Sequence, residues 1–331
     1  MIYIHIPFCK SFCTYCGFYS EICSEKVQNL FVGELISEIN RRREEIGRTL
    51  GVNTLYVGGG TPSLLPAASL KKIVDALGYE RYEEFTVEVN PEDIVTKGAE
   101  YLRALRGMGV NRVSMGVQSF DDGILRWMGR RHTASRAEEA FHMLRDAGFD
   151  NISIDLIFGI SQLTDEMWYA TVGKAMELAP EHISAYQLGI DEESVLAEMV
   201  EDGRYLEADD EHCRRQYDHL CSLLRDAGYH HYEISNFAVP GKEAVHNSAY
   251  WRRVPYVGLG PGAHSLRDGD IRSWNSRDIS GWTSEEEHLT SEEIREERIM
   301  LGLRTDLGVD GMSIPESDWF IADSIIRDMM P

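Results

Sequence analysis

Short apolar runs of β type alternate with helical patterns from the first residues of the chain to about residue 190. This alternation predicts a parallel sheet whose strands are connected by helices. The predicted strands are 2–6, 54–57, 84–89, 112–117, 152–157 and 182–187. Six β/α units favour an α/β fold of the partial (β/α)6 TIM-like barrel type, open on one side, over a complete barrel of eight units.

The chain changes character after residue 190. Residues 191–211 carry ten acidic residues and one basic residue, a composition typical of a solvated, mobile connector. We therefore predict three parts: a barrel in 1–190, a connector followed by an aromatic-rich and His-rich region in 191–285, and a small accessory helical region in 286–331. Helices are expected at about 208–227 and 291–301, and a further helix should begin after Thr164 as its N-cap.

Charge and hydropathy exclude several classes of protein. The 331 residues include 33 Lys and Arg against 55 Asp and Glu, a formal net charge of −22, which disfavours nucleic acid as a partner. No apolar run approaches the ~20 residues that a membrane span needs, and the first residues lack the features of a signal peptide. We expect a cytoplasmic protein without a transmembrane segment, which leaves peripheral membrane contact open.

Three of the six cysteines, Cys9, Cys13 and Cys16, fall within eight residues. Three thiolates leave one position of a metal centre open, which favours a 4Fe-4S cluster with one iron free for an external ligand. Two alternatives remain at this point: a zinc site completed by His5 or Cys23, and reduced structural thiols. The loop also carries aromatic side chains that would shield a cluster from water, namely Phe8, Phe12, Tyr15 and Phe18.

Polar residues occupy positions in or just after predicted strands where apolar ones are expected. Glu88, Asp155 and Gln118 are such positions, and the carboxyl ends of barrel strands meet at one mouth. The stretch 58–62, Gly-Gly-Gly-Thr-Pro, follows the second strand and would let backbone groups approach a ligand closely. The alternatives are core carboxylates satisfied by their neighbours and an ordinary tight turn.

Five stretches together resemble the radical S-adenosylmethionine (SAM) superfamily. They are 3–18 (YIHIPFCKSFCTYCGF), 58–63 (GGGTPS), 88–91 (EVNP), 116–120 (GVQSF) and 155–159 (DLIFG). Within the superfamily the chain is similar to the group that contains oxygen-independent coproporphyrinogen III oxidase and the HemW family of haem chaperones. The resemblance runs from Tyr3 to about Leu303.

The resemblance implies a 4Fe-4S cluster on Cys9, Cys13 and Cys16, with SAM bound to the open iron. Cleavage of SAM would yield a 5′-deoxyadenosyl radical, and an electron donor would be needed. The implied SAM contacts are Tyr3, Tyr15, Gly59, Gly60, Thr61, Glu88, Gln118, Arg130 and Asp155.

Two features separate the oxidase from the haem chaperones. The oxidase has a further cysteine two positions after the third cluster ligand, where this chain has Phe18, and a longer segment before its first strand. Residues 246–251, His-Asn-Ser-Ala-Tyr-Trp, resemble the His-Asn-x-x-Tyr-Trp motif of the haem chaperones.

The implied haem residues are His246, Asn247, Tyr250 and Trp251, because a neutral imidazole is a good axial ligand and aromatic rings offer a flat wall. Without the resemblance, these residues are better explained as groups that hydrogen-bond a loop (His246 and Asn247) and fill the core (Tyr250 and Trp251). Arg252 and Arg253 are candidates for propionate contacts, or a solvated basic pair.

The sequence therefore predicts a haem chaperone with haem as its cargo and haem-acceptor proteins as its partners. A second hypothesis is a radical SAM enzyme that decarboxylates or remodels a related tetrapyrrole, and a third is a zinc-stabilised binding protein. Because the family continues further beyond the segment equivalent to 298–305, we also expect an abbreviated or truncated accessory domain.

Overall fold

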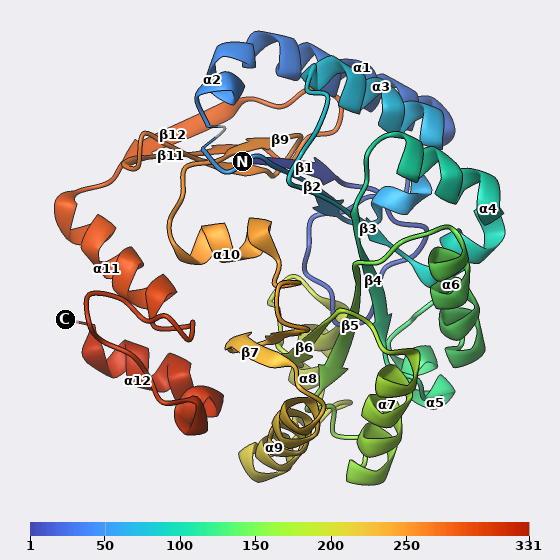
Figure 1. The fold of residues 1–331 in the computed structure, drawn as a ribbon, viewed down its shortest axis with the longest axis vertical. Coiled ribbons are helices and arrows are strands. Elements are labelled where there is room, and N and C mark those ends of the chain that lie inside the picture. The colour runs from blue at the N-terminus through green and yellow to red at the C-terminus, as the bar shows by residue number, and fades with distance from the viewer. Residues whose placement is uncertain (50, 331) are drawn as a thin grey trace.

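The computed structural model describes residues 1–49 and 51–330. Its main sheet has nine strands in the order β7-β8-β6-β5-β4-β3-β2-β1-β9 and curls into an open barrel (Figure 1). The six parallel strands are β1 (Ile2–Ile6), β2 (Thr54–Gly59), β3 (Glu84–Val89), β4 (Arg112–Gln118), β5 (Ile152–Phe158) and β6 (His182–Gln187). All six predicted strands are confirmed to within two residues, and so is the partial (β/α)6 fold.

Helices connect these strands along the outside of the sheet (Figure 1). They are α1 (Glu25–Arg41), α2 (Arg43–Arg48), α3 (Ala67–Leu77), α4 (Pro91–Gly107), α5 (Asp122–Trp127), α6 (Ala134–Asp146) and α7 (Asp165–Leu178), with a short 3-10 turn, η1 (Pro62–Leu64). Thr164 caps α7 as predicted, since its hydroxyl accepts a hydrogen bond from the Met167 amide at 3.3 Å. Trp168 on α7 is fully buried, and its indole N–H donates to Gln216 O at 2.9 Å.

The chain after β6 returns to the sheet at both of its edges. It forms α8 (Val195–Glu201), α9 (Asp210–Asp226), β7 (His230–Glu233), β8 (Asn236–Ala238), α10 (Val245–Trp251) and β9 (Val257–Leu259). Strand β8 pairs antiparallel with β6, and β9 pairs parallel with β1. Three strands of the 191–285 segment thus belong to the main sheet, while α10 lies within the curve of the barrel (Figure 1).

The prediction of a solvated, mobile connector in 191–211 is wrong for its middle part. Helix α8 lies there, with Leu196 fully buried. The Leu196 amide donates to Thr14 O at 2.8 Å, so α8 packs on the cysteine-bearing loop. Two of the ten acidic residues, Glu198 and Glu201, lie on the exposed side of this ordered helix, and most of the others lie in the segments that flank it.

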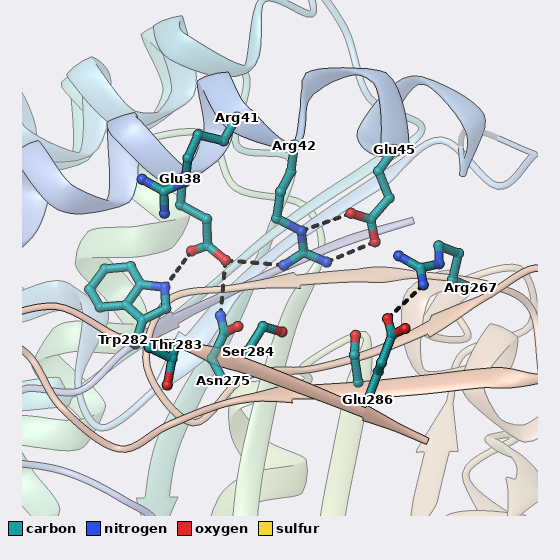
Figure 2. Close-up of a pocket in the computed structure, with 11 residues that line it drawn as sticks. Glu38, Arg41, Arg42, Glu45, Arg267, Asn275, Trp282, Thr283, Ser284 and Glu286 are labelled. Carbon is teal, nitrogen blue, oxygen red and sulfur yellow. Dashed lines mark hydrogen bonds and ion pairs between the residues drawn. The ribbon is translucent and has the colours of Figure 1, made fainter. Parts of the chain in front are cut away.

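A small antiparallel sheet of β10 (His264–Arg267), β11 (Ile271–Asn275) and β12 (Ser284–His288) faces the end of α1. The buried carboxylate of Glu38 joins the two by accepting from Asn275 Nδ2 (2.9 Å) and Trp282 Nε1 (2.9 Å), and Arg42 pairs with it at 3.0 Å (Figure 2). A cavity of about 440 Å³ lies beside this junction. Arg267 on its rim pairs with Glu286, so the cavity walls largely satisfy their own charges (Figure 2).

The C-terminal part contains α11 (Ser291–Gly302), η2 (Glu316–Ile321) and α12 (Ala322–Met329). Helix α11 confirms the helix predicted at 291–301 and begins at a capping box formed by Thr290 and Glu293. Within the described residues, no helix combines the length and the apolar character that crossing a bilayer requires.

Candidate functional site

The loop after β1 carries the three clustered cysteines at the carboxyl end of the barrel. Cys9 is tied to the loop by its amide, which donates to Glu21 O at 3.0 Å, and its Sγ lies 3.5 Å from Thr61 Oγ1. Arg130 Nη1 donates to Cys13 Sγ at 3.4 Å. Arg130 therefore places a hydrogen-bond donor directly against one of the three clustered sulfurs.

The donor set fits an iron-sulfur cluster better than a single zinc ion. Across residues 1–49 and 51–330, no three His, Cys, Asp or Glu side chains converge as ligands of one ion would. In a cluster each thiolate binds a different iron, so such convergence is not required. The fourth zinc ligands considered above are also engaged: His5 lies 3.0 Å from both Tyr3 Oη and Tyr19 O, and Cys23 Sγ donates to Glu21.

The aromatic residues of this loop divide into two groups. Phe8 is fully buried and packs edge-on against Phe31, and burial raises the pKa of Tyr15. Phe12 and Phe18, by contrast, are 56% and 75% exposed. Phe8 is therefore part of the core beside the loop, whereas Phe12 and Phe18 are largely open to solvent in this structure.

The glycine-rich turn after β2 packs directly against the cysteine loop. A Cβ on Gly60 would lie 2.8 Å from Phe8 O and 3.1 Å from Cys9 Sγ. Gly59 adopts a φ of +113°, which L side chains rarely reach. Gly60 is thus required by the close approach of the two loops and Gly59 by its backbone conformation, and Thr61 beside them reaches Cys9.

Glu88 projects from the end of β3 toward the same turn. Its Oε1 accepts from Tyr56 Oη at 2.7 Å and its Oε2 accepts from the Gly59 amide at 3.1 Å. Burial raises the pKa of Glu88 to about 7, although both donors favour the charged form. A carboxylate with this pKa can hold a ribose hydroxyl or an ammonium group.

Asp155 on β5 and the end of β4 complete the mouth. Ser114 Oγ donates to Asp155 at 3.1 Å, and burial raises the pKa of this aspartate. Gln118 has a φ of +70°, an unusual conformation for a residue other than glycine. Arg130 donates to Gly116 O as well as to Cys13, and its Nε is buried with no partner among the described residues, so one of its three nitrogens is unpaired there.

Tyr3 lies lower in the barrel on β1, with its hydroxyl 3.0 Å from His5 Nδ1. Burial, followed by the charge of Glu88, raises the pKa of Tyr3. The nine implied SAM contacts thus come from β1 to β5 and the loops that follow these strands. The structure brings Glu88 and Gly59 together at the barrel mouth next to the cysteine loop, and it places Tyr3 deeper in the barrel, beside Tyr56.

The His246 motif lies elsewhere, at the opposite end of β2. His246 is fully buried on α10, with Nδ1 2.8 Å from Thr54 Oγ1 and Nε2 3.1 Å from Tyr250 Oη. Burial lowers its pKa to about 3, so the imidazole is neutral. Asn247 and Trp251 are partly buried, and the Trp251 indole N–H has no partner within the described residues.

The two arginines after this motif differ. Arg253 donates to Glu297 at 2.6 Å and to Gly269 O, whereas Arg252 is exposed. Arg253 is therefore committed to α11 in this arrangement, and only Arg252 is free at the surface to meet an anion.

Three barrel residues belong to this architecture and were not identified from the sequence: Tyr56, Glu84 and Arg112. Tyr56 lies between Glu88 and His246, with its ring centroid 5.2 Å from that of His246. Glu84 accepts from the amides of Val245 and His246 at 2.7 and 3.1 Å. Arg112 is the first residue of β4. The alternation of these polar residues with apolar ones along β2, β3 and β4 is the sequence signal that could have placed them inside the barrel.

Comparison with known proteins agrees with this geometry. Residues 3–175 match the family described as the Radical SAM superfamily. A solved structure described as coproporphyrinogen III oxidase (HemN) from Escherichia coli, a radical SAM enzyme, superimposes with a TM-score of 0.75 at 22% identity, over 92% of this chain and 75% of that one. The chain belongs to the radical SAM superfamily, and this membership implies a 4Fe-4S cluster and SAM as cofactors.

Similarity to curated proteins narrows the assignment. The chain is 35% identical to "Heme chaperone HemW" of Lactococcus lactis subsp. lactis (strain IL1403) over 319 residues, which cover 93% of this chain and 82% of the relative. It is also 35% identical to "Heme chaperone HemW" of Bacillus subtilis (strain 168), over 93% of this chain and 84% of the relative. Within the superfamily, the chain belongs to the HemW family.

Proposed function

We propose that this protein is a haem chaperone that binds haem and transfers it to acceptor proteins. The observation that carries the proposal is the 35% identity to proteins named haem chaperones across 93% of the chain, which includes the 246–251 motif. In this proposal Cys9, Cys13 and Cys16 hold a 4Fe-4S cluster. The bound cluster and SAM would supply reducing chemistry that supports or gates haem transfer.

The side chains at the barrel mouth would bind and orient SAM. Glu88 accepts two hydrogen bonds, and its pKa is about 7. A bound ammonium or hydroxyl group would favour the charged carboxylate, so Glu88 would release its proton to solvent when such a ligand binds. Arg130 would steady the Cys13 thiolate with one donor and direct its free Nε toward a ligand carboxylate. The remaining surface of SAM would be enclosed by Tyr15, Thr61, Gln118 and Asp155.

His246 is proposed as the axial haem ligand, with Asn247, Tyr250 and Trp251 beside it. Its pKa near 3 keeps the imidazole in the neutral form that binds iron. Both ring nitrogens contact hydroxyl groups in this arrangement, so haem coordination requires the contact with Tyr250 or with Thr54 to break. Arg252 would meet a propionate.

The test is haem binding by the His246→Ala variant, with His288→Ala as a matched control because His288 is exposed on β12, away from this motif. His246→Ala should weaken haem binding at least about tenfold and change the Soret spectrum, since an axial ligand contributes more than about 1.4 kcal/mol. His288→Ala should bind like the wild type. Equal spectra and affinities for all three proteins would exclude His246 as the ligand.

A second measurement separates a chaperone from a decarboxylase. The reconstituted, dithionite-reduced protein should release no carbon dioxide from coproporphyrinogen III and should pass haem to an apo-acceptor. Carbon dioxide release coupled to formation of 5′-deoxyadenosine would overturn the chaperone proposal in favour of an oxidase.

A further inference from the structure

Helix α10 is attached to the barrel through a carboxylate from a distant strand. Glu84, at the start of β3, is 4% exposed; its Oε2 accepts from the Val245 amide at 2.7 Å and its Oε1 from the His246 amide at 3.1 Å. The N-cap residue Ala244 has no side chain that could serve these amides. Glu84 therefore satisfies helix donors that would otherwise be buried without partners.

The remaining attachments of α10 are also largely polar. His246 contacts Thr54 and Tyr250, and the Ala244 amide donates to Tyr232 Oη at 3.3 Å. Of the seven residues in α10, only His246 and Ala249 are fully buried. Aromatic contacts add to these bonds: the ring of Tyr250 packs edge-on against that of Tyr256, with centroids 4.7 Å apart. Water can replace the hydrogen bonds if the helix moves away.

A buried arginine, Arg112, lies near Glu84. Arg112 on β4 is 1% exposed, and its Nε and Nη1 have no partner in the described part of the chain. Burial lowers the pKa of Arg112, but nearby negative charges, Glu84 first among them, raise it overall, so the guanidinium remains charged. If α10 moved away, Arg112 would remain as a partner for the freed carboxylate.

We propose that α10 is a displaceable plug of the barrel and that Glu84 is the positioning residue that latches it, so that release of this latch brings His246 to solvent. The relevance of this opening to haem rests on the proposed function. The opening itself does not depend on haem. In the closed state Glu84 accepts from the amides of Val245 and His246, and in the open state it pairs with Arg112 instead.

The main experiment compares Glu84→Gln with Glu83→Gln in the full, anaerobically reconstituted chain. Glutamine presents one acceptor oxygen where Glu84 uses two, while Glu83 is an exposed neighbour on the same segment. Two readouts follow the plug: hydrogen exchange of the α10 amides, and the rate at which diethyl pyrocarbonate acylates His246. His132 is the internal reference, since it is equally buried and its pKa is likewise lowered to about 3.

We expect Glu84→Gln to accelerate both α10 exchange and His246 acylation at least about tenfold, with His132 unchanged and Glu83→Gln matching the wild type. Unchanged exchange and acylation in Glu84→Gln would overturn the proposal. A parallel rise at His132 would also overturn it, because that result would mean general loosening of the barrel.

A measurement on the wild type covers the case in which Glu84→Gln does not fold. Hydrogen exchange in increasing, sub-denaturing urea should reveal α10 opening below global unfolding, and exchange of α10 only with the whole barrel would refute a separate plug. Haem uptake separates the two proposals. Accelerated His246 acylation in a protein that binds no haem would refute the chaperone function and leave the plug standing, whereas faster haem association by Glu84→Gln would support both.

Discussion

Replacing Glu88 by Gln should change how stability depends on pH, with a sign that the structure fixes. Burial raises the pKa of Glu88 from 4.5 to about 7, so the folded chain holds this proton more tightly than the unfolded chain. The resulting stabilisation is fully present below pH 4.5 and is lost as the pH rises through 7. Over the interval from about pH 5 to about pH 8.5 the loss amounts to about 2.5 kcal/mol.

The assay is urea unfolding of the cluster-free chain at several pH values, followed by tryptophan fluorescence. The free energy of unfolding of the wild type minus that of Glu88→Gln should fall by about 2.5 kcal/mol across this interval. The amide also disturbs the hydrogen bonds from Tyr56 and Gly59, but that cost does not vary with pH. Other titrating groups, such as Glu233, cancel in the difference.

Glu83→Gln is the control, because it makes the same change at an exposed position on the same segment. If the difference for Glu88→Gln varied with pH no more than that for Glu83→Gln, Glu88 would not be held in an environment that favours its protonated form. A difference that grows with pH would refute the reasoning outright, since it would require a pKa below 4.5 in the folded chain.

Four further outcomes are expected. Tyr56→Phe removes a donor to the Glu88 carboxylate, so the pKa of Glu88 should rise. When Glu88→Gln is compared with its parent in this background, the midpoint of the pH profile should lie above 7, and an unchanged midpoint would contradict the contact. Cys13→Ser should abolish iron-sulfur absorbance after anaerobic reconstitution, whereas Cys221→Ser, outside the loop, should retain it. Gly60→Ala should lower cluster yield and weaken SAM binding at least about tenfold, because its Cβ would lie 2.8 Å from Phe8 O. Gly173→Ala, with open space around it on α7, should stabilise the chain by about 0.5–1 kcal/mol in urea unfolding.

The barrel could be predicted because its signal is local. Each strand of β1 to β6 is a short apolar run bounded by turn residues, and each helix repeats its apolar residues at helical spacing. The positions of Glu88 and Asp155 followed from the same logic, because parallel strands place their carboxyl ends at one mouth. The location of this candidate site therefore required only strand order and direction.

The place of α10 could not be predicted, because contacts between residues far apart in the chain determine it. Glu84 and Val245 are separated by 161 positions, and neither residue type signals the other. The acidic composition around α8 was misleading for a related reason. The acidic side chains of α8 face solvent, and Leu196 is the residue of this helix that is buried. The average composition of a segment does not reveal a single buried position of this kind.

The polar interior of this barrel explains why α10 can occupy it and still be displaced at a low cost in free energy. Barrel interiors are usually filled by layers of branched apolar side chains. Here Ser114 on β4 donates to Asp155 on the neighbouring strand β5, and Thr54 contacts His246 of α10. An apolar lumen would lose buried area if α10 left, at roughly 25 cal/mol per Å². A polar lumen loses mainly hydrogen bonds, and water can restore most of these, so the interior chemistry itself lowers the free energy needed to open the barrel at α10.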